Sequence, residues 1–184
     1  MTLQHARGLG LLLLLLGGCR SPATAPAPPD LSVRLQQFVA APGDFAGYAS
    51  WRSNSIVGPA PEGSPHTTEL RTVYLNQAPP HDSATFPVGT VIVKTVHSSP
   101  GDLTLDQTFA MAKRGGNYDF SGALGWEWFE LDVTVEPPAV IWRGLSPPAG
   151  VMYSTASAVD CSGCHTAAQA NDYVQDPGLQ LASF

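Results

Sequence analysis

Alternating apolar and polar positions predict β-strands along much of the chain. Thr90–His97 is almost entirely β-branched, and Trp126–Val135 alternates apolar with polar side chains, as strands usually do. Leu70–Asn76 has the same character, and Val140–Arg143 follows two prolines as a further short strand. Leu103–Arg114 fits either a strand or a short helix. The many Gly and Pro residues between these stretches are typical of a β-rich domain with turns.

Helical patterns flank the predicted strands. Asp30 can cap a helix that begins at Leu31 and ends at Ala41–Gly43, since Pro and Gly stop a helix. The apolar positions at helical spacing are Leu31, Leu35, Phe38 and Val39. A second helix is predicted from about Ala156 to Asn171, which is rich in Ala and Ser. The expected fold class is therefore α+β: a mainly antiparallel β-sheet with an N-terminal helix and a C-terminal helix.

The start of the chain has the pattern of a signal peptide. Arg7 precedes an unbroken leucine run, Leu11–Leu16, which is too short to span a bilayer as a permanent helix. Leu16-Gly17-Gly18-Cys19 resembles the bacterial lipobox, in which the cysteine becomes the lipidated first residue of the mature protein. An ordinary signal peptide cut after a later alanine is the alternative.

The chain is expected to have three parts. Residues 1–18 form the lipoprotein signal peptide, and residues 19–30 contain the lipidated Cys19 and a Pro/Ala-rich tether. Such a tether has too few bulky apolar side chains to bury a core. Residues 31–184 are long enough for one domain with one core.

The charge balance is acidic. Nine Lys and Arg stand against fifteen Asp and Glu; loss of Arg7 with the signal peptide leaves eight basic residues and a formal charge of −7. No basic run is present, which argues against nucleic acid as a partner.

The residue after the lipidated cysteine bears on the location of the protein. Arg20 follows Cys19, whereas inner-membrane retention in many Gram-negative bacteria depends on Asp at this position. The expected location is the periplasmic side of the outer membrane, with the inner membrane as the less favoured alternative.

The most specific motif is Cys161-Ser162-Gly163-Cys164-His165, the C-x-x-C-H pattern of c-type haem attachment. Two thiols separated by two residues can add to the two vinyl groups of one haem, and the following histidine can supply an axial nitrogen to the iron. The motif predicts one covalent haem c per chain, bound by Cys161 and Cys164, with His165 as the metal ligand. With Cys19 lipidated, all three cysteines are then used.

Two alternatives to haem remain weaker. A zinc site would need a second pair of Cys or His ligands, but His66, His81 and His97 lie far apart and form no pair. A thioredoxin-like redox pair would need a βαβ pattern around the two cysteines, and none surrounds them.

The position of the motif favours an open iron site. Only nineteen residues follow His165, and none of them is methionine. A sixth ligand would have to come from the preceding part, where Met111 and Met152 are the candidates, although a lone Met is more often a packing residue. An open or water-filled sixth position indicates small-ligand binding or catalysis. An electron carrier with a distal Met is the alternative.

The order of motifs resembles the cytochrome P-460 family, which includes the c prime-beta cytochromes. The resemblance runs from about Tyr48 to Val174 and ends in the haem motif. It rests on the following segments: Tyr48–Trp51, Glu69–Asn76, Phe86–Lys94, Met111–Lys113, Trp126–Phe129 and Asp172–Val174. Residues 31–184 would then be a cytochrome P-460-like haem domain whose C-terminal helix carries the haem and which is often dimeric.

The resemblance also implies a role for Lys94. In the hydroxylamine-oxidising members, a lysine at the end of a strand like Phe86–Lys94 bonds covalently to the haem ring, whereas c prime-beta members bind nitric oxide or carbon monoxide in an apolar pocket. The mature chain has only two lysines, and Lys94 shares a strand face with Ile92 and Val96. A strand-end lysine that reaches solvent remains the alternative.

Two positions depart from the family pattern. Gln175 stands where an aromatic residue usually follows Asp-Tyr-Val. The distal carboxylate of the oxidising members has no secure counterpart, although Glu69 and Asp106 are possible substitutes. Phe109 would instead line an apolar pocket that favours gas binding.

The sequence therefore predicts a periplasm-facing mono-haem cytochrome that binds small nitrogen ligands, nitric oxide or hydroxylamine. It leaves open whether the protein is an oxidoreductase that oxidises hydroxylamine or a non-enzymatic nitric oxide-binding protein. A cytochrome redox partner and a homodimer are compatible with both.

Overall fold

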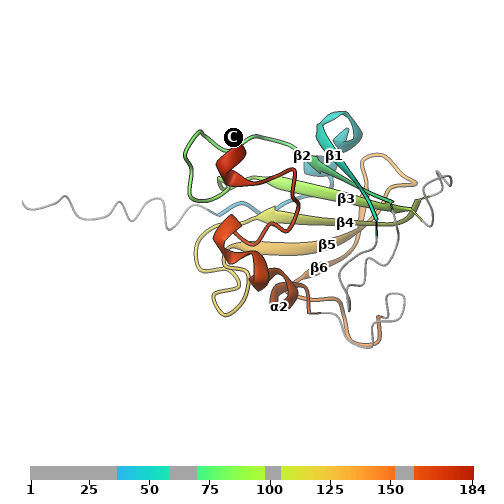
Figure 1. The fold of residues 1–184 in the computed structure, drawn as a ribbon. Helices are drawn as coiled ribbons and strands as arrows, with labels where there is room; N and C mark the ends of the chain where they lie inside the picture. Colours follow the sequence, from blue (N-terminus) through green and yellow to red (C-terminus); the bar gives the residue numbers. More distant parts are fainter. Residues whose placement is uncertain (1–36, 59–69, 98–104, 152–159) are drawn as a thin grey trace, which may run out of the picture.

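A computed structural model describes residues 37–58, 70–97, 105–151 and 160–184. Its main feature is one six-stranded antiparallel sheet whose strands are ordered as in the sequence (Figure 1). The strands are β1 (Arg52–Val57), β2 (Leu70–Leu75), β3 (Val91–His97), β4 (Leu105–Lys113), β5 (Trp126–Asp132) and β6 (Ala139–Gly144).

The helices of the described part are all short. They are η1 (Pro42–Phe45), η2 (Tyr48–Ser50), α2 (Cys161–His165), η3 (Thr166–Asn171) and η4 (Leu181–Ser183), of which only α2 is an α-helix. Within the described residues, none of them is long and apolar enough to cross a membrane.

The predicted strands are confirmed, and the ambiguous stretch Leu103–Arg114 contains a strand, β4. The strand predicted at Trp126–Val135 ends earlier, at Asp132, because the Asp132 carboxylate accepts hydrogen bonds from the amide (2.9 Å) and hydroxyl (2.6 Å) of Thr134. Strand β1 was not predicted. Its sequence, RSNSIV, is mostly polar, and it forms a partly exposed edge of the sheet.

The predicted N-terminal helix is not supported. Most of it lies outside the described residues, but residues 37–41 have no helical structure. The amide of Phe38 donates instead to the carbonyl of Arg114 (3.0 Å), and the residue before Pro42 is extended, as the proline ring requires. The first residues of the predicted C-terminal helix, 156–159, lie outside the described residues. From Cys161 to Asn171 the helix is present but less regular than predicted, because α2 passes directly into the 3₁₀-helix η3.

The two faces of the sheet are covered by opposite ends of the described chain. One face, here called the C-terminal face, packs on the segment from α2 to η4 (Figure 1). Its cluster includes the buried residues Val73, Leu75, Ile92, Met111, Trp126, Trp128, Trp142, Tyr173, Val174, Leu179 and Leu181. The other face packs on η1 and η2 through Phe45, Val91, Val93, Ala110, Ala112, Phe129 and Leu131. The sheet is thus buried on both faces, and the C-x-x-C-H motif lies on the first.

Candidate functional site

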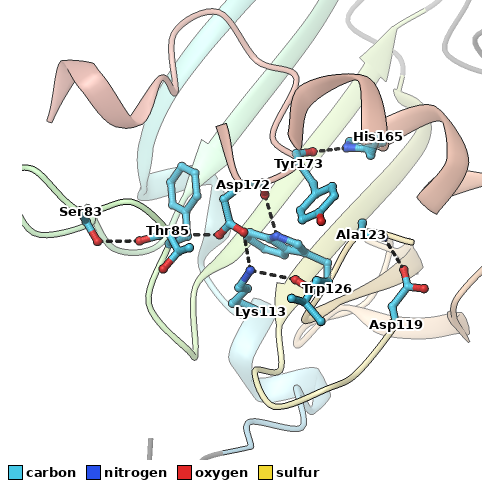
Figure 2. Close-up of polar contacts among 11 residues, drawn as sticks. Ser83, Thr85, Lys113, Asp119, Ala123, Trp126, His165, Asp172 and Tyr173 are labelled. Atoms are coloured by element: carbon cyan, nitrogen blue, oxygen red, sulfur yellow. Dashed lines mark hydrogen bonds and ion pairs between the residues drawn. The ribbon is translucent and has the colours of Figure 1, made fainter. Parts of the chain in front are cut away.

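The motif helix α2 is fastened to the sheet through a buried serine. Ser162 accepts a hydrogen bond from Trp128 Nε1 on β5 (3.0 Å) and donates one to the Asp119 carboxylate. The same carboxylate accepts a hydrogen bond from the amide of Ala123 (2.9 Å; Figure 2). A Cβ atom at Gly122 would come within 2.7 Å of Ser162 Cβ, so this loop can approach the helix only with glycine there. These contacts fix the two cysteines and the histidine relative to the sheet.

The imidazole of His165 has a defined orientation. Its Nδ1 atom lies 2.6 Å from the carbonyl oxygen of Tyr173 (Figure 2), and since a carbonyl can only accept, Nδ1 carries the proton. The ring packs on Trp128, with 4.4 Å between ring centroids. Burial, opposed by the hydrogen bond to Tyr173 and assisted by the charge of nearby Lys94, lowers the pKa of His165 to about 4. The histidine is therefore neutral at pH 7 and keeps Nε2 available as a metal ligand.

The two cysteines of the motif form no disulfide bond. Cys161 is half-buried and packs against the cluster of the C-terminal face, whereas Cys164 is exposed. Burial raises the pKa of the Cys161 thiol to about 12. A thioredoxin-like redox pair depends on a lowered thiol pKa, so this environment argues against that alternative.

Lys94 lies on the C-terminal face beside the motif. It is half-buried on β3, and burial together with the charge of Arg71 lowers its pKa to about 7, opposed by Cys161, Asp176 and Cys164. The prediction that Lys94 shares a face with Ile92 and Val96 is confirmed by the strand pairing, in which Ile92 is opposite Met111 and Lys94 is opposite Phe109. The lysine thus points toward the haem motif rather than away from it.

One register row crosses the whole sheet through Lys94. Successive paired residues in this row, which we call the Lys94 row, are Asn54, Val73, Lys94, Phe109, Glu130 and Trp142. Adjacent strands are about 4.8 Å apart, so Lys94 and Glu130, two strands apart, have Cα atoms separated by about 10 Å. The half-buried Phe109 stands between them.

Glu130 is a carboxylate on this face that the sequence alone did not single out. One of its oxygens, Oε2, accepts a hydrogen bond from Trp142 Nε1 (2.7 Å). The alternation of Trp126–Val135 predicts that Glu130 lies on the polar face of the strand, away from Phe129 and Leu131. Glu130 lies on the same face of β5 as Trp126 and Trp128. These tryptophans belong to the cluster against which Cys161 packs, so this is the face that the motif covers. The position of the motif over this face was the missing information.

The other predicted residues are placed differently. Met111 is buried within the cluster of the C-terminal face, which fits a packing role. Cys19, Glu69 and Met152 lie outside the described residues, as does the side chain of Asp106. Gln175 donates from Nε2 to the carbonyl of Cys164 (2.6 Å), so the residue that departs from the family pattern still holds the motif helix.

The described residues also bear on the zinc alternative. Within the ranges that the structure covers, no group of three or more His, Cys, Asp or Glu side chains is arranged to hold a metal ion. His81 is exposed beside Asp82, far from the motif in sequence, and His66 lies in a range that is not described.

The chain is similar to one known protein family over most of its length. No curated protein matches the chain. The family model Cytochrome P460 matches residues 46–175, a range that spans all six strands, the C-x-x-C-H motif and His165. This match covers well over half of the sequence and implies a haem cofactor. The chain therefore belongs to the cytochrome P460 family.

Proposed function

We propose that this chain is a mono-haem c-type cytochrome in which Cys161 and Cys164 hold the haem and His165 ligates the iron. The residues fit the group: both thiols are unpaired, and the histidine has Nδ1 bonded to a carbonyl and Nε2 available. In the Lys94 row, the amine of Lys94, the ring of Phe109 and the carboxylate of Glu130 lie side by side on the face covered by the motif.

The observation that carries the function is the position of Glu130. When bound, the haem supplies an iron that can bind a small nitrogen ligand and accept electrons from it. Glu130 can take a proton from such a ligand, since a carboxylate on this face is the general base that an oxidation needs. Trp142 fixes the carboxylate through a hydrogen bond of 2.7 Å to Oε2. We therefore favour hydroxylamine oxidation, in which a haem-bonded Lys94 further tunes the iron.

A second function, non-enzymatic binding of nitric oxide, is favoured by Phe109. Its ring stands between Lys94 and Glu130 in the Lys94 row and packs against the apolar cluster. An aromatic wall accommodates a diatomic gas without any proton transfer. An electron carrier with Met111 as sixth ligand is less well supported because Met111 is buried in the cluster of the C-terminal face.

The variant Glu130→Gln separates the two functions. It keeps the shape and the hydrogen bond from Trp142 but removes the base, so hydroxylamine oxidation should fall about 100-fold while nitric oxide binding, followed by the absorption spectrum of the ferrous protein, is retained. Glu136→Gln, the same change at an exposed acid, is the control. Wild-type protein that binds nitric oxide but does not oxidise hydroxylamine would leave only the binding function.

Location and partners are further parts of the proposal. Lipid on Cys19 would hold the domain on the periplasmic side of the outer membrane, with residues 20–30 as a tether. An oxidation at the iron requires an electron acceptor, for which a second cytochrome is the simplest class. A homodimer is compatible with this arrangement.

A further inference from the structure

The turn that follows the haem motif has an unusual backbone. Asp172 and Tyr173 both adopt left-handed conformations, with φ angles of 50° and 68°. Residues other than glycine rarely adopt this region, and two in succession persist only when the surroundings hold them. This turn determines where the Tyr173 carbonyl points, and that carbonyl accepts the hydrogen bond of His165 Nδ1 at 2.6 Å.

Three buried hydrogen bonds hold the turn (Figure 2). Lys113 Nζ lies 2.6 Å from Asp172 Oδ1, and the amide of Phe86 donates to Oδ2 at 2.9 Å. Trp126 Nε1 donates to the backbone carbonyl of Asp172 at 2.8 Å. The Lys113 and Asp172 side chains are 9% and 4% exposed, so the ion pair is sheltered from water. Two segments that carried the family resemblance, Met111–Lys113 and Asp172–Val174, thus meet at this pair.

We propose that Lys113 and Asp172 are positioning residues for the axial histidine. The inference rests on the proposed binding of haem iron by His165. The ion pair holds the left-handed turn, and the turn aims the Tyr173 carbonyl. The carbonyl keeps the proton on Nδ1, so that Nε2 is unprotonated and would be able to ligate the iron. Trp128 supports the ring from another side, at 4.4 Å between centroids.

The arrangement has an electronic consequence. A hydrogen bond donated by the remote nitrogen makes a ligating histidine more basic and fixes its orientation. A more basic ligand favours the ferric state, so a weaker bond at Nδ1 should raise the reduction potential. It should also lower the frequency of the iron–histidine vibration in the ferrous protein.

Substitutions in the haem-loaded full chain test this inference. Asp172→Asn keeps a residue that tolerates the left-handed conformation and removes the charge, while Lys113→Met removes the other partner. Either variant should raise the reduction potential and lower the iron–histidine frequency measured by resonance Raman spectroscopy. The double variant Lys113→Met/Asp172→Asn leaves no unpaired buried charge, so it supplies the same comparison if a single variant fails to fold.

Glu127→Gln is the matched control. Glu127 is a buried acid whose Oε2 lies 2.6 Å from Arg143 Nη2, and it pairs with Ala112, which belongs to the cluster on the face of the sheet away from the motif. Its substitution should lower the melting temperature without moving the iron–histidine frequency. Haem-loaded variants at 113 and 172 with wild-type potential and frequency would overturn the inference, as would an equal shift in Glu127→Gln. Wild-type protein without haem would instead overturn the proposed function.

Discussion

At the scale of single residues, the site depends on a few side chains whose surroundings set their chemistry. His165 is kept neutral by burial, which lowers its pKa to about 4, and it is oriented by the Tyr173 carbonyl. Lys94 is held on an apolar strand face, where burial lowers its pKa to about 7. An amine with a lowered pKa is a better nucleophile at neutral pH, which is compatible with a bond between Lys94 and the haem ring.

Trypsin digestion of the holoprotein tests that bond. If Lys94 is bonded to haem, cleavage after it is blocked, and residues 72–113 should be joined through haem to residues 144–184. Mass spectrometry would detect this species. In Lys94→Arg the two segments should separate and only residues 144–184 should carry haem. An unmodified peptide ending at Lys94 in the wild-type digest would exclude the bond and leave small-ligand binding alone.

At the scale of elements, α2 is too short to be stable by itself. It contains five residues, and its position comes from side-chain contacts with β5 and the loop at Asp119. Gln175 adds a hydrogen bond to the carbonyl of Cys164. The geometry of the haem motif is therefore a property of the sheet and loops around it.

Ser162→Ala should destabilise the fold by about 1–3 kcal/mol, because it removes the acceptor of Trp128 Nε1 and one of the two hydrogen bonds that the buried Asp119 carboxylate accepts. Ser183→Ala, at an exposed serine in η4, is the matched control and should have little effect. Thermal unfolding of both proteins measures the difference. Equal melting temperatures for the two variants would mean that the serine does not fasten the helix.

The strands show what the sequence could predict and what it could not. Apolar alternation located β2, β3 and β5, because each buries a regular face. The polar edge strand β1 could not be predicted from the sequence, because it depends on pairing with β2. The absence of helix in residues 37–41 could not be predicted either, because it depends on a hydrogen bond from Phe38 to the distant Arg114. At the candidate site, the spacing of Cys161, Cys164 and His165 predicts haem attachment, and this stays a prediction. Glu130 was missed because only the folded sheet brings it to the face beneath the motif.

At the scale of the whole molecule, the described domain is one sheet covered on both faces (Figure 1). The C-terminal segment supplies the predicted haem ligands, and the sheet supplies the Lys94 row. Both lie within residues 46–175, which match the cytochrome P460 family model.

Membrane attachment is a prediction about the complete protein. Cys19→Ala should release the protein from the membrane fraction or leave it unprocessed, because the acyl chains would have no attachment site. Fractionation of cells and the mass of the mature N-terminus would report the change. Normal processing and unchanged membrane location in this variant would contradict the lipoprotein assignment.

The most direct test of the account is the mass of the denatured holoprotein after acid–acetone extraction. We predict that the chain keeps the mass of one haem, because covalent bonds survive a treatment that removes ligated haem. The variant Cys161→Ser/Cys164→Ser/Lys94→Arg, which lacks every residue proposed to bond to the haem, should lose it. Extraction of the haem from the wild-type chain, or zinc at one ion per chain in place of iron, would contradict the account.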